Sequence, residues 1–176
     1  LFGGTGNDIL DGGAGIDTVN YSDSDSVILT LANTGSSALA KIGIEEDTVT
    51  NVENIVGSEY ADTLGGNNDN NILDGGLGSD TLIASDGIDT LIGGSGTDTI
   101  DYSARSNAIE VTLNETASTI LKESGVNKDT IYQIENVLGS SANDTIAGDS
   151  NSNIIKGNAG ADTLSGGTGN DYLDGE

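Results

Sequence analysis

The sequence predicts an all-β fold, a right-handed parallel β-roll (β-solenoid) with two wider spacer coils. Two observations predict it. Nine-residue, glycine-rich units recur in three blocks that keep one register, and every unit has a large aliphatic residue at its eighth position. A fixed short period of this kind is typical of a solenoid, in which each repeat contacts only its neighbours.

Eleven units follow the pattern, and all but one begin with glycine. They start at Gly3, Gly12, Gly57, Gly66, Gly75, Ala84, Gly93, Gly139, Gly148, Gly157 and Gly166. The eighth position is Leu10, Val19, Leu64, Leu73, Leu82, Leu91, Ile100, Ile146, Ile155, Leu164 and Leu173. The sixth position is Asp8, Asp17, Asp62, Asp80, Asp89, Asp98, Asp144, Asp162 and Asp171, with Asn71 and Asn153 as the two exceptions. Three coupled columns exclude a chance pattern.

One unit contains the parts of a turn followed by a strand. Glycines at positions one, two and four allow positive φ, so the chain can curl and direct its carbonyl oxygens inward. Positions seven to nine then form a short strand whose aliphatic residue points inward and whose neighbours point outward. Two units make one coil, so turns n and n+2 lie on the same edge of the roll.

The sixth position predicts metal binding. Carboxylate and carbonyl oxygens suit a hard cation of the calcium type, and stacked turns place such a cation between two loops. The predicted ligands are the sixth-position residues named above, together with backbone carbonyls near Gly75, Gly78, Gly93 and Gly96. Asp80 with Asp98 is the best same-edge pair, and Asp89 is expected to face Asn71 on the other edge. Several calcium ions are expected, with weak or no binding at the uncharged asparagine turns.

The charge balance supports a role for cations. The net charge is −24 on 176 residues, with one Phe, no Trp and no Pro, which is typical of a chain that stays expanded until counter-ions arrive. One large aliphatic per unit contributes only roughly 1.5–3 kcal/mol on burial. Without cations the chain is therefore expected to be largely unfolded. Its negative field argues against nucleic-acid and anionic-lipid partners.

Two spacers separate the blocks and are copies of each other at an offset of 82 residues. The predicted organisation is one continuous β-roll fragment over 1–176, with ranges 1–20 (block 1), 21–56 (spacer 1), 57–101 (block 2), 102–138 (spacer 2) and 139–176 (block 3). The spacers are expected to continue the roll as wider coils. Four of the five basic residues lie in the spacers, which predicts that they sit away from the ion rows: Lys41, Arg105, Lys122 and Lys128.

The stretches 3–8 and 166–171 both read G-G-T-G-N-D. They resemble the signature of the repeats-in-toxin (RTX) family, the hemolysin-type calcium-binding repeats. The resemblance implies a structural calcium-binding module of a large secreted bacterial protein, whether toxin, adhesin or exoenzyme. Such a module folds on extracellular calcium after type I secretion. The implied location is extracellular or on the bacterial cell surface, with neighbouring domains of the parent protein as partners and no membrane insertion by this segment.

Other function classes are weaker. The absence of His and Cys removes histidine-based triads, cysteine nucleophiles and the usual zinc sites, so the chain is not expected to be an enzyme. No EF-hand loop is present either. A polysaccharide- or surface-binding recognition module remains the alternative. Its aromatic contacts would come from the five tyrosines, Tyr21, Tyr60, Tyr102, Tyr132 and Tyr172, of which Tyr21 and Tyr102 fit strand-end packing better.

Overall fold

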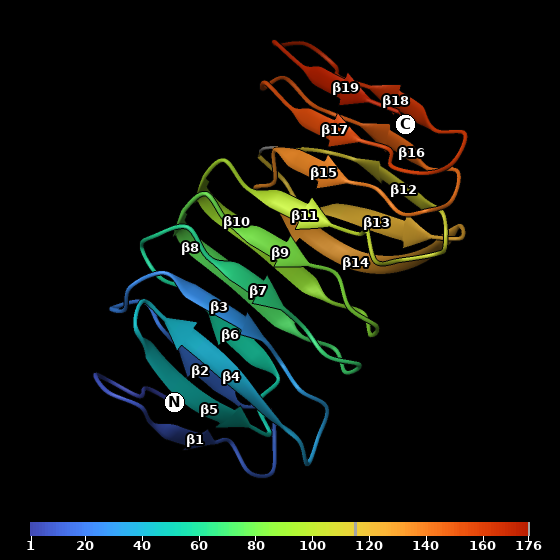
Figure 1. The fold of residues 1–176 in the computed structure, drawn as a ribbon. Coiled ribbons are helices and arrows are strands. Elements are labelled where there is room, and N and C mark those ends of the chain that lie inside the picture. The colour runs from blue at the N-terminus through green and yellow to red at the C-terminus, as the bar shows by residue number, and fades with distance from the viewer. Residues whose placement is uncertain (115, 176) are drawn as a thin grey trace.

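The computed structural model describes residues 1–114 and 116–175, and all regular secondary structure in this part of the chain is β-strand. The strands form two sheets that lie face to face, with the N-terminus at one end of the stack and the C-terminus near the other (Figure 1). None of the described residues forms a helix with the length and hydropathy needed to cross a membrane.

The first sheet has ten strands. In spatial order they are β1 (Ile9–Asp11), β5 (Glu45–Thr50), β4 (Ser37–Ile42), β3 (Val27–Thr30), β7 (Thr63–Gly65), β9 (Thr81–Ile83), β11 (Thr99–Asp101), β15 (Asn136–Leu138), β17 (Ile154–Lys156) and β19 (Tyr172–Asp174). The second sheet has nine strands. They are β18 (Thr163–Ser165), β16 (Thr145–Ala147), β12 (Ile109–Thr112), β13 (Thr119–Glu123), β14 (Val126–Tyr132), β10 (Thr90–Gly96), β8 (Ile72–Gly78), β6 (Asn54–Val56) and β2 (Thr18–Asn20).

Strands of the repeat blocks alternate between the two sheets and pair in parallel with the strand two units away. In the first sheet Leu64 is opposite Leu82 and Leu82 is opposite Ile100, while in the second sheet Leu73 is opposite Leu91. Each pair joins residues 18 positions apart, which is two nine-residue units. The predicted β-roll, with two units per coil, is therefore confirmed.

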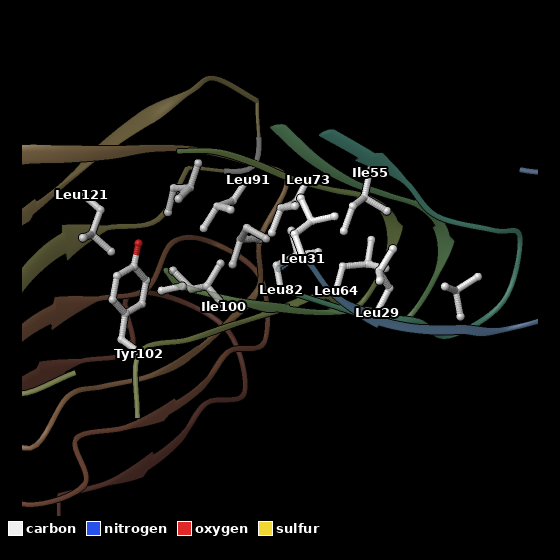
Figure 2. Packing of buried hydrophobic residues seen from close by; sticks show 14 of the residues in the cluster. Leu29, Leu31, Ile55, Leu64, Leu73, Leu82, Leu91, Ile100, Tyr102 and Leu121 are labelled. Atoms are coloured by element: carbon white, nitrogen blue, oxygen red, sulfur yellow. The ribbon is translucent and has the colours of Figure 1, made fainter. Parts of the chain in front are cut away.

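The eighth-position aliphatics fill the space between the sheets. Nine of them are buried, and they belong to one hydrophobic cluster. Figure 2 shows part of this cluster, with Leu64, Leu73, Leu82, Leu91 and Ile100 of the repeat units beside Leu29, Leu31, Ile55, Tyr102 and Leu121 of the spacers. The last two aliphatics differ: Leu164 is partly buried and Leu173 is exposed. Their strands β18 and β19 are the final strands of the two sheets, so each is covered on one side only.

Each spacer remains within the two sheets and adds a three-stranded antiparallel meander to one of them. In the first spacer, β3, β4 and β5 lie between β1 and β7; in the second, β12, β13 and β14 lie between β16 and β10. In the opposite sheet the neighbouring coils pair directly, with Val19 opposite Ile55 and Ile100 opposite Val137.

The two meanders lie in different sheets. This is because the repeat block between them has five units, an odd number, and consecutive units alternate between the two sheets. The apolar alternation of the spacers predicts strands but not the antiparallel direction, because direction depends on where each turn returns the chain.

Candidate metal centre

Glycine-rich turns connect the two sheets, and consecutive turns on one edge lie directly over each other. The turns Gly75–Asp80 and Gly93–Asp98 stack so closely that the pairing of β8 with β10 continues into them, with Gly76 opposite Gly94 and Gly78 opposite Gly96. The φ angle of Gly96 is 150°, and a Cβ atom there would lie 1.4 Å from the carbonyl oxygen of Gly78. Only glycine allows this approach of one turn to the next.

The first glycine of a unit has a different role from the one predicted. Positive φ occurs at the second and fourth glycines, and none of the first-position glycines has it. The prediction of positive φ at position one is therefore wrong. A Cβ atom on Gly75 would instead lie 2.3 Å from Oδ2 of Asp80 and 2.6 Å from the carbonyl oxygen of Gly93. The first glycine leaves space for the carboxylate of its own unit.

The sixth-position side chains form hydrogen-bonded ladders along the edges of the stack. Oδ1 of Asp98 accepts from the backbone N–H of Asp80 at 2.8 Å, and Oδ1 of Asp80 accepts from the N–H of Asp62 at 2.8 Å. The same bond, always across 18 residues, joins three further pairs: Asp89 to Asn71, Asp162 to Asp144, and Asp171 to Asn153. One oxygen of each carboxylate thus holds two coils in register.

The second oxygen of several aspartates has no hydrogen-bond donor. Six buried oxygens in the described residues lack any partner, the Oδ2 atoms of Asp8, Asp17, Asp80, Asp98, Asp149 and Asp162. Five of the six belong to sixth-position residues. A buried, unpaired carboxylate oxygen is costly, so each of these atoms requires a compensating positive charge or a proton.

The residue at position two separates units whose carboxylate is left unpaired from units whose carboxylate has a donor. In four units with glycine there, Oδ2 has no partner: Asp8, Asp17, Asp80 and Asp98. In units with serine, the serine donates to the carboxylate. Ser58 donates its N–H to Oδ2 of Asp62 at 2.5 Å and its hydroxyl to Oδ1 at 2.9 Å, and Ser140 does the same for Asp144 at 2.6 and 2.8 Å. The Oδ2 atom of Asp162 is also unpaired, although Asn158 stands at position two of its unit. We call turns whose sixth-position Oδ2 has no partner open turns, and turns in which a serine donates to the carboxylate closed turns.

A comparison with models of protein families matches the RTX calcium-binding nonapeptide repeat, in four copies over residues 1–20, 50–82, 74–104 and 138–175. These ranges cover more than half of the chain and leave out most of both spacers. The chain belongs to the RTX repeat family. The resemblance seen in the G-G-T-G-N-D stretches is thereby confirmed. A comparison with curated proteins found no match.

RTX repeats bind calcium, and the open turns fit this ion. Within residues 1–114 and 116–175, no three acidic side chains converge on one point. A cation in an RTX turn here must therefore draw on backbone carbonyls beside one or two carboxylates, which agrees with the oxygen-only ligand sets that calcium accepts. The carbonyl oxygen of Gly93 and Oδ2 of Asp80 both border the Cα atom of Gly75, so oxygens of two stacked turns meet there.

The electrostatics of the central open turns also favour a bound cation. Burial raises the pKa of Asp80 to about 7; the charges of Asp98, Asp62 and Asp74 act in the same direction, and a hydrogen bond from the Asp62 backbone opposes them. Burial likewise raises the pKa of Asp98. Without a cation, the folded structure therefore disfavours the ionised form of these two carboxylates. A divalent ion supplies the positive charge that compensates their negative charge.

The two asparagine units are satisfied by their own surroundings. Oδ1 of Asn71 accepts from the N–H of Asn67 at 2.8 Å, and its Nδ2 donates to the carbonyl of Glu53 at 2.7 Å. Asn153 bonds in the same way to Asp149 and Glu135. These contacts agree with the expectation that the two asparagine turns are uncharged and stack on the neighbouring turns. Asp89 lies beside Asn71 as predicted, and its N–H donates in turn to Oδ1 of Asp129 at 2.8 Å.

Four ladder residues in the spacers were missed by the sequence reasoning. Asp47 and Asp129 are fully buried, and Oδ1 of each accepts from the N–H of a sixth-position aspartate. Glu53 and Glu135 accept in the same way from Asp17 and Asp98, both at 2.8 Å. The signal was present, because Asp-Thr-aliphatic in both spacers repeats positions six to eight of a regular unit such as 98–100.

The prediction that basic spacer residues lie away from the turns is wrong for two of them. Arg105 forms an ion pair with Asp86 at 2.7 Å, and Asp86 belongs to the turn that begins at Ala84. Lys128 donates from Nζ to the carbonyl oxygen of Gly87 in the same turn. Lys128 lies in β14, which returns alongside β10, and this pairing places it against a repeat turn.

Proposed function

We propose that this chain is a calcium-ordered structural segment of a large secreted bacterial protein. It stays unfolded at the low calcium concentration of the cytosol, passes through a type I secretion channel, and folds outside the cell or at its surface. The three repeat blocks and both spacers form one continuous β-roll in this proposal, with neighbouring domains of the parent protein as its structural partners. No catalytic step is assigned to it.

The observation that carries the proposal is the set of unpaired carboxylate oxygens in the open turns. They are buried in a chain whose net charge is −24, so folding without a cation brings uncompensated negative charges together. Calcium removes this cost only in the folded state, because the unfolded chain does not hold two turns against each other. A ligand that binds only the folded state stabilises it by mass action.

We assign the calcium ligands first to the open turns. These are Asp8, Asp17, Asp80, Asp98 and Asp162. We add Asp171, because glycine stands at position two of its unit. Asp80 with Asp98 is the pair best supported, since both are buried and their turns stack in register. A ligand role for Asp62, Asp89, Asp144, Asn71 and Asn153 stays a prediction, because donors within the chain already occupy their side-chain oxygens.

The alternative function, polysaccharide binding, has less support. Tyr21 and Tyr102 are buried and donate their hydroxyls to Asp47 and Asp129, so neither offers a ring face for stacking on a sugar. The other three tyrosines are each at least 37% exposed but lie on separate coils: Tyr60 before β7, Tyr132 at the end of β14 and Tyr172 in β19.

A calcium titration followed by far-UV circular dichroism tests the proposal. Starting from the chelated chain, we expect strand signal to appear cooperatively with a midpoint of about 10⁻⁴ to 10⁻³ M, the range of extracellular calcium modules. Magnesium serves as the control and should not replace calcium at equal concentration, because it retains its water ligands and demands octahedral geometry. A full strand spectrum in excess EDTA would refute the proposal.

A further inference from the structure

Both spacers place an aspartate next to a repeat turn in the same way. Oδ1 of Asp47 accepts from the N–H of Asp8 at 2.9 Å, and Tyr21 donates its hydroxyl to Oδ2 of Asp47 at 3.2 Å. We call these three residues the first-spacer site. The second-spacer site consists of Asp89, Asp129 and Tyr102, with Oδ1 of Asp129 accepting from the N–H of Asp89 at 2.8 Å and Tyr102 donating to Oδ2 of Asp129. The two sites share the same three residue types and the same two hydrogen bonds between them.

The sites differ in charge at one position. The residue before the spacer aspartate is Glu46 in the first spacer and Lys128 in the second. Glu46 is exposed, and its backbone N–H donates to Oδ1 of Asn7, the residue before Asp8. The Oδ2 atom of Asp8 is buried without a donor. Lys128 is half-buried, and its Nζ donates to the carbonyl oxygen of Gly87 in the turn that contains Asp89.

The turn of the second-spacer site is also a closed turn, because a serine stands at its position two. This turn has Ser85 where the first-spacer turn has Gly4, and the Ser85 hydroxyl donates to Oδ2 of Asp89 at 2.7 Å. Both acids of the site are nevertheless buried, Asp89 at 1% and Asp129 at 0% exposure. Hydrogen bonds alone leave the negative charge of this pair uncompensated, so a cation is still required.

An ammonium group can supply that charge. It is a compact cation with three donors, and backbone carbonyls are ligands it shares with calcium. Nζ of Lys128 donates to the carbonyl oxygen of Gly87, which lies two residues before Asp89 in the same turn, and Lys128 itself directly precedes Asp129. The positive charge is thus held at the turn that contains Asp89.

We propose that the Lys128 ammonium is a tethered cation that takes the place of a calcium ion at the second-spacer site. The turn 84–89 and the meander of the second spacer are then ordered at lower calcium than the first-spacer site, which lacks such a lysine. This inference rests on the proposed function, since it assigns which turns depend on calcium. The two modules, otherwise copies of each other, thus differ in their response to the ion.

The test compares calcium titrations of Lys128→Met and Lys122→Met by far-UV circular dichroism, with thermal unfolding at low and high calcium. Lys122 is the matched control, because its ammonium forms an ion pair at 2.9 Å with Glu110, an exposed residue of strand β12 in the same spacer. Lys128→Met is expected to raise the calcium midpoint about tenfold over the control. Its loss of thermal stability should largely disappear at high calcium, because the free ion then fills the site. Equal midpoints for both variants, or a loss that calcium does not restore, would overturn the inference.

A reciprocal pair of variants covers the case in which Lys128→Met fails to fold. Glu46→Lys should lower the calcium midpoint by providing the first-spacer site with its own cation, and Glu45→Lys makes the same charge change one residue away. Equal shifts for these two variants also overturn the inference. The wild-type titration reports on the proposed function separately. A chain already folded in EDTA would refute calcium-ordered folding, and the thermal unfolding of the lysine variants at low and high calcium would still test the inference.

Discussion

Asp80→Asn with Asp98→Asn raises the calcium concentration needed for folding by about tenfold or more, the largest effect that we expect from any change of side-chain charge. Each amide keeps the size of the carboxylate but removes its charge. These two aspartates lie in stacked open turns, are buried, and have Oδ2 atoms without a donor. The central coils therefore lose the charged ligands that make calcium binding favourable.

The matched control is Asp23→Asn with Asp25→Asn. This pair makes the same change in net charge at exposed positions of the first spacer. It should move the midpoint only slightly, since screened surface charges interact weakly. Circular dichroism titrations of the two double variants provide the comparison. If both shift the midpoint equally, the response reflects overall charge, and the assignment of ligands to the open turns is wrong.

Gly96→Ala strongly destabilises the calcium-bound roll, whereas Gly6→Ala has a much smaller effect. Both glycines occupy position four of a unit and have positive φ, 150° and 105°. Alanine at either site carries the conformational cost of that region, on the order of 1–3 kcal/mol. Only at Gly96 would the added Cβ also meet another turn, 1.4 Å from the carbonyl oxygen of Gly78; at Gly6 it meets nothing within 4 Å.

Thermal unfolding in saturating calcium measures this difference. The stacked turns must separate to admit the methyl group that Gly96→Ala adds. We therefore expect the register between β8 and β10 to be lost near the substitution and the midpoint temperature to fall well below that of Gly6→Ala. Equal losses in the two variants would mean that backbone conformation, and not the close approach of stacked turns, explains the glycine at position four.

Much of the fold was predictable from the sequence because its information is local and periodic. The strand positions, the inward aliphatic column and the pairing of units n and n+2 all follow from the nine-residue register, and Leu64 opposite Leu82 confirms it. The antiparallel meanders were not predictable. Their direction depends on where the loops of the spacers return the chain, and the apolar alternation of a strand does not specify this.

The residue types of the candidate site were predictable from the sequence, but whether each carboxylate has a hydrogen-bond donor was not. The sixth-position column identified the carboxylates and the sequence favoured Asp80 with Asp98, yet neither showed that Asp62 has hydrogen-bond donors of its own. The difference between Asp62 and Asp80 arises from Ser58 and Gly76, four residues upstream, which decide whether a donor meets the carboxylate. Lys128 could not be assigned for a related reason: it contacts Gly87, 41 residues away, only because the meander folds back.

The most direct test of calcium between stacked open turns is an anomalous difference map from a crystal of the chain grown in calcium. The account predicts a peak within about 2.3–2.6 Å of the Oδ2 atoms of Asp80 and Asp98, the usual calcium–oxygen distance. We expect a weaker peak at the carboxylate of Asp144, whose oxygens already accept hydrogen bonds from Ser140. A folded chain with no peak beside Asp80 or Asp98 would contradict the account.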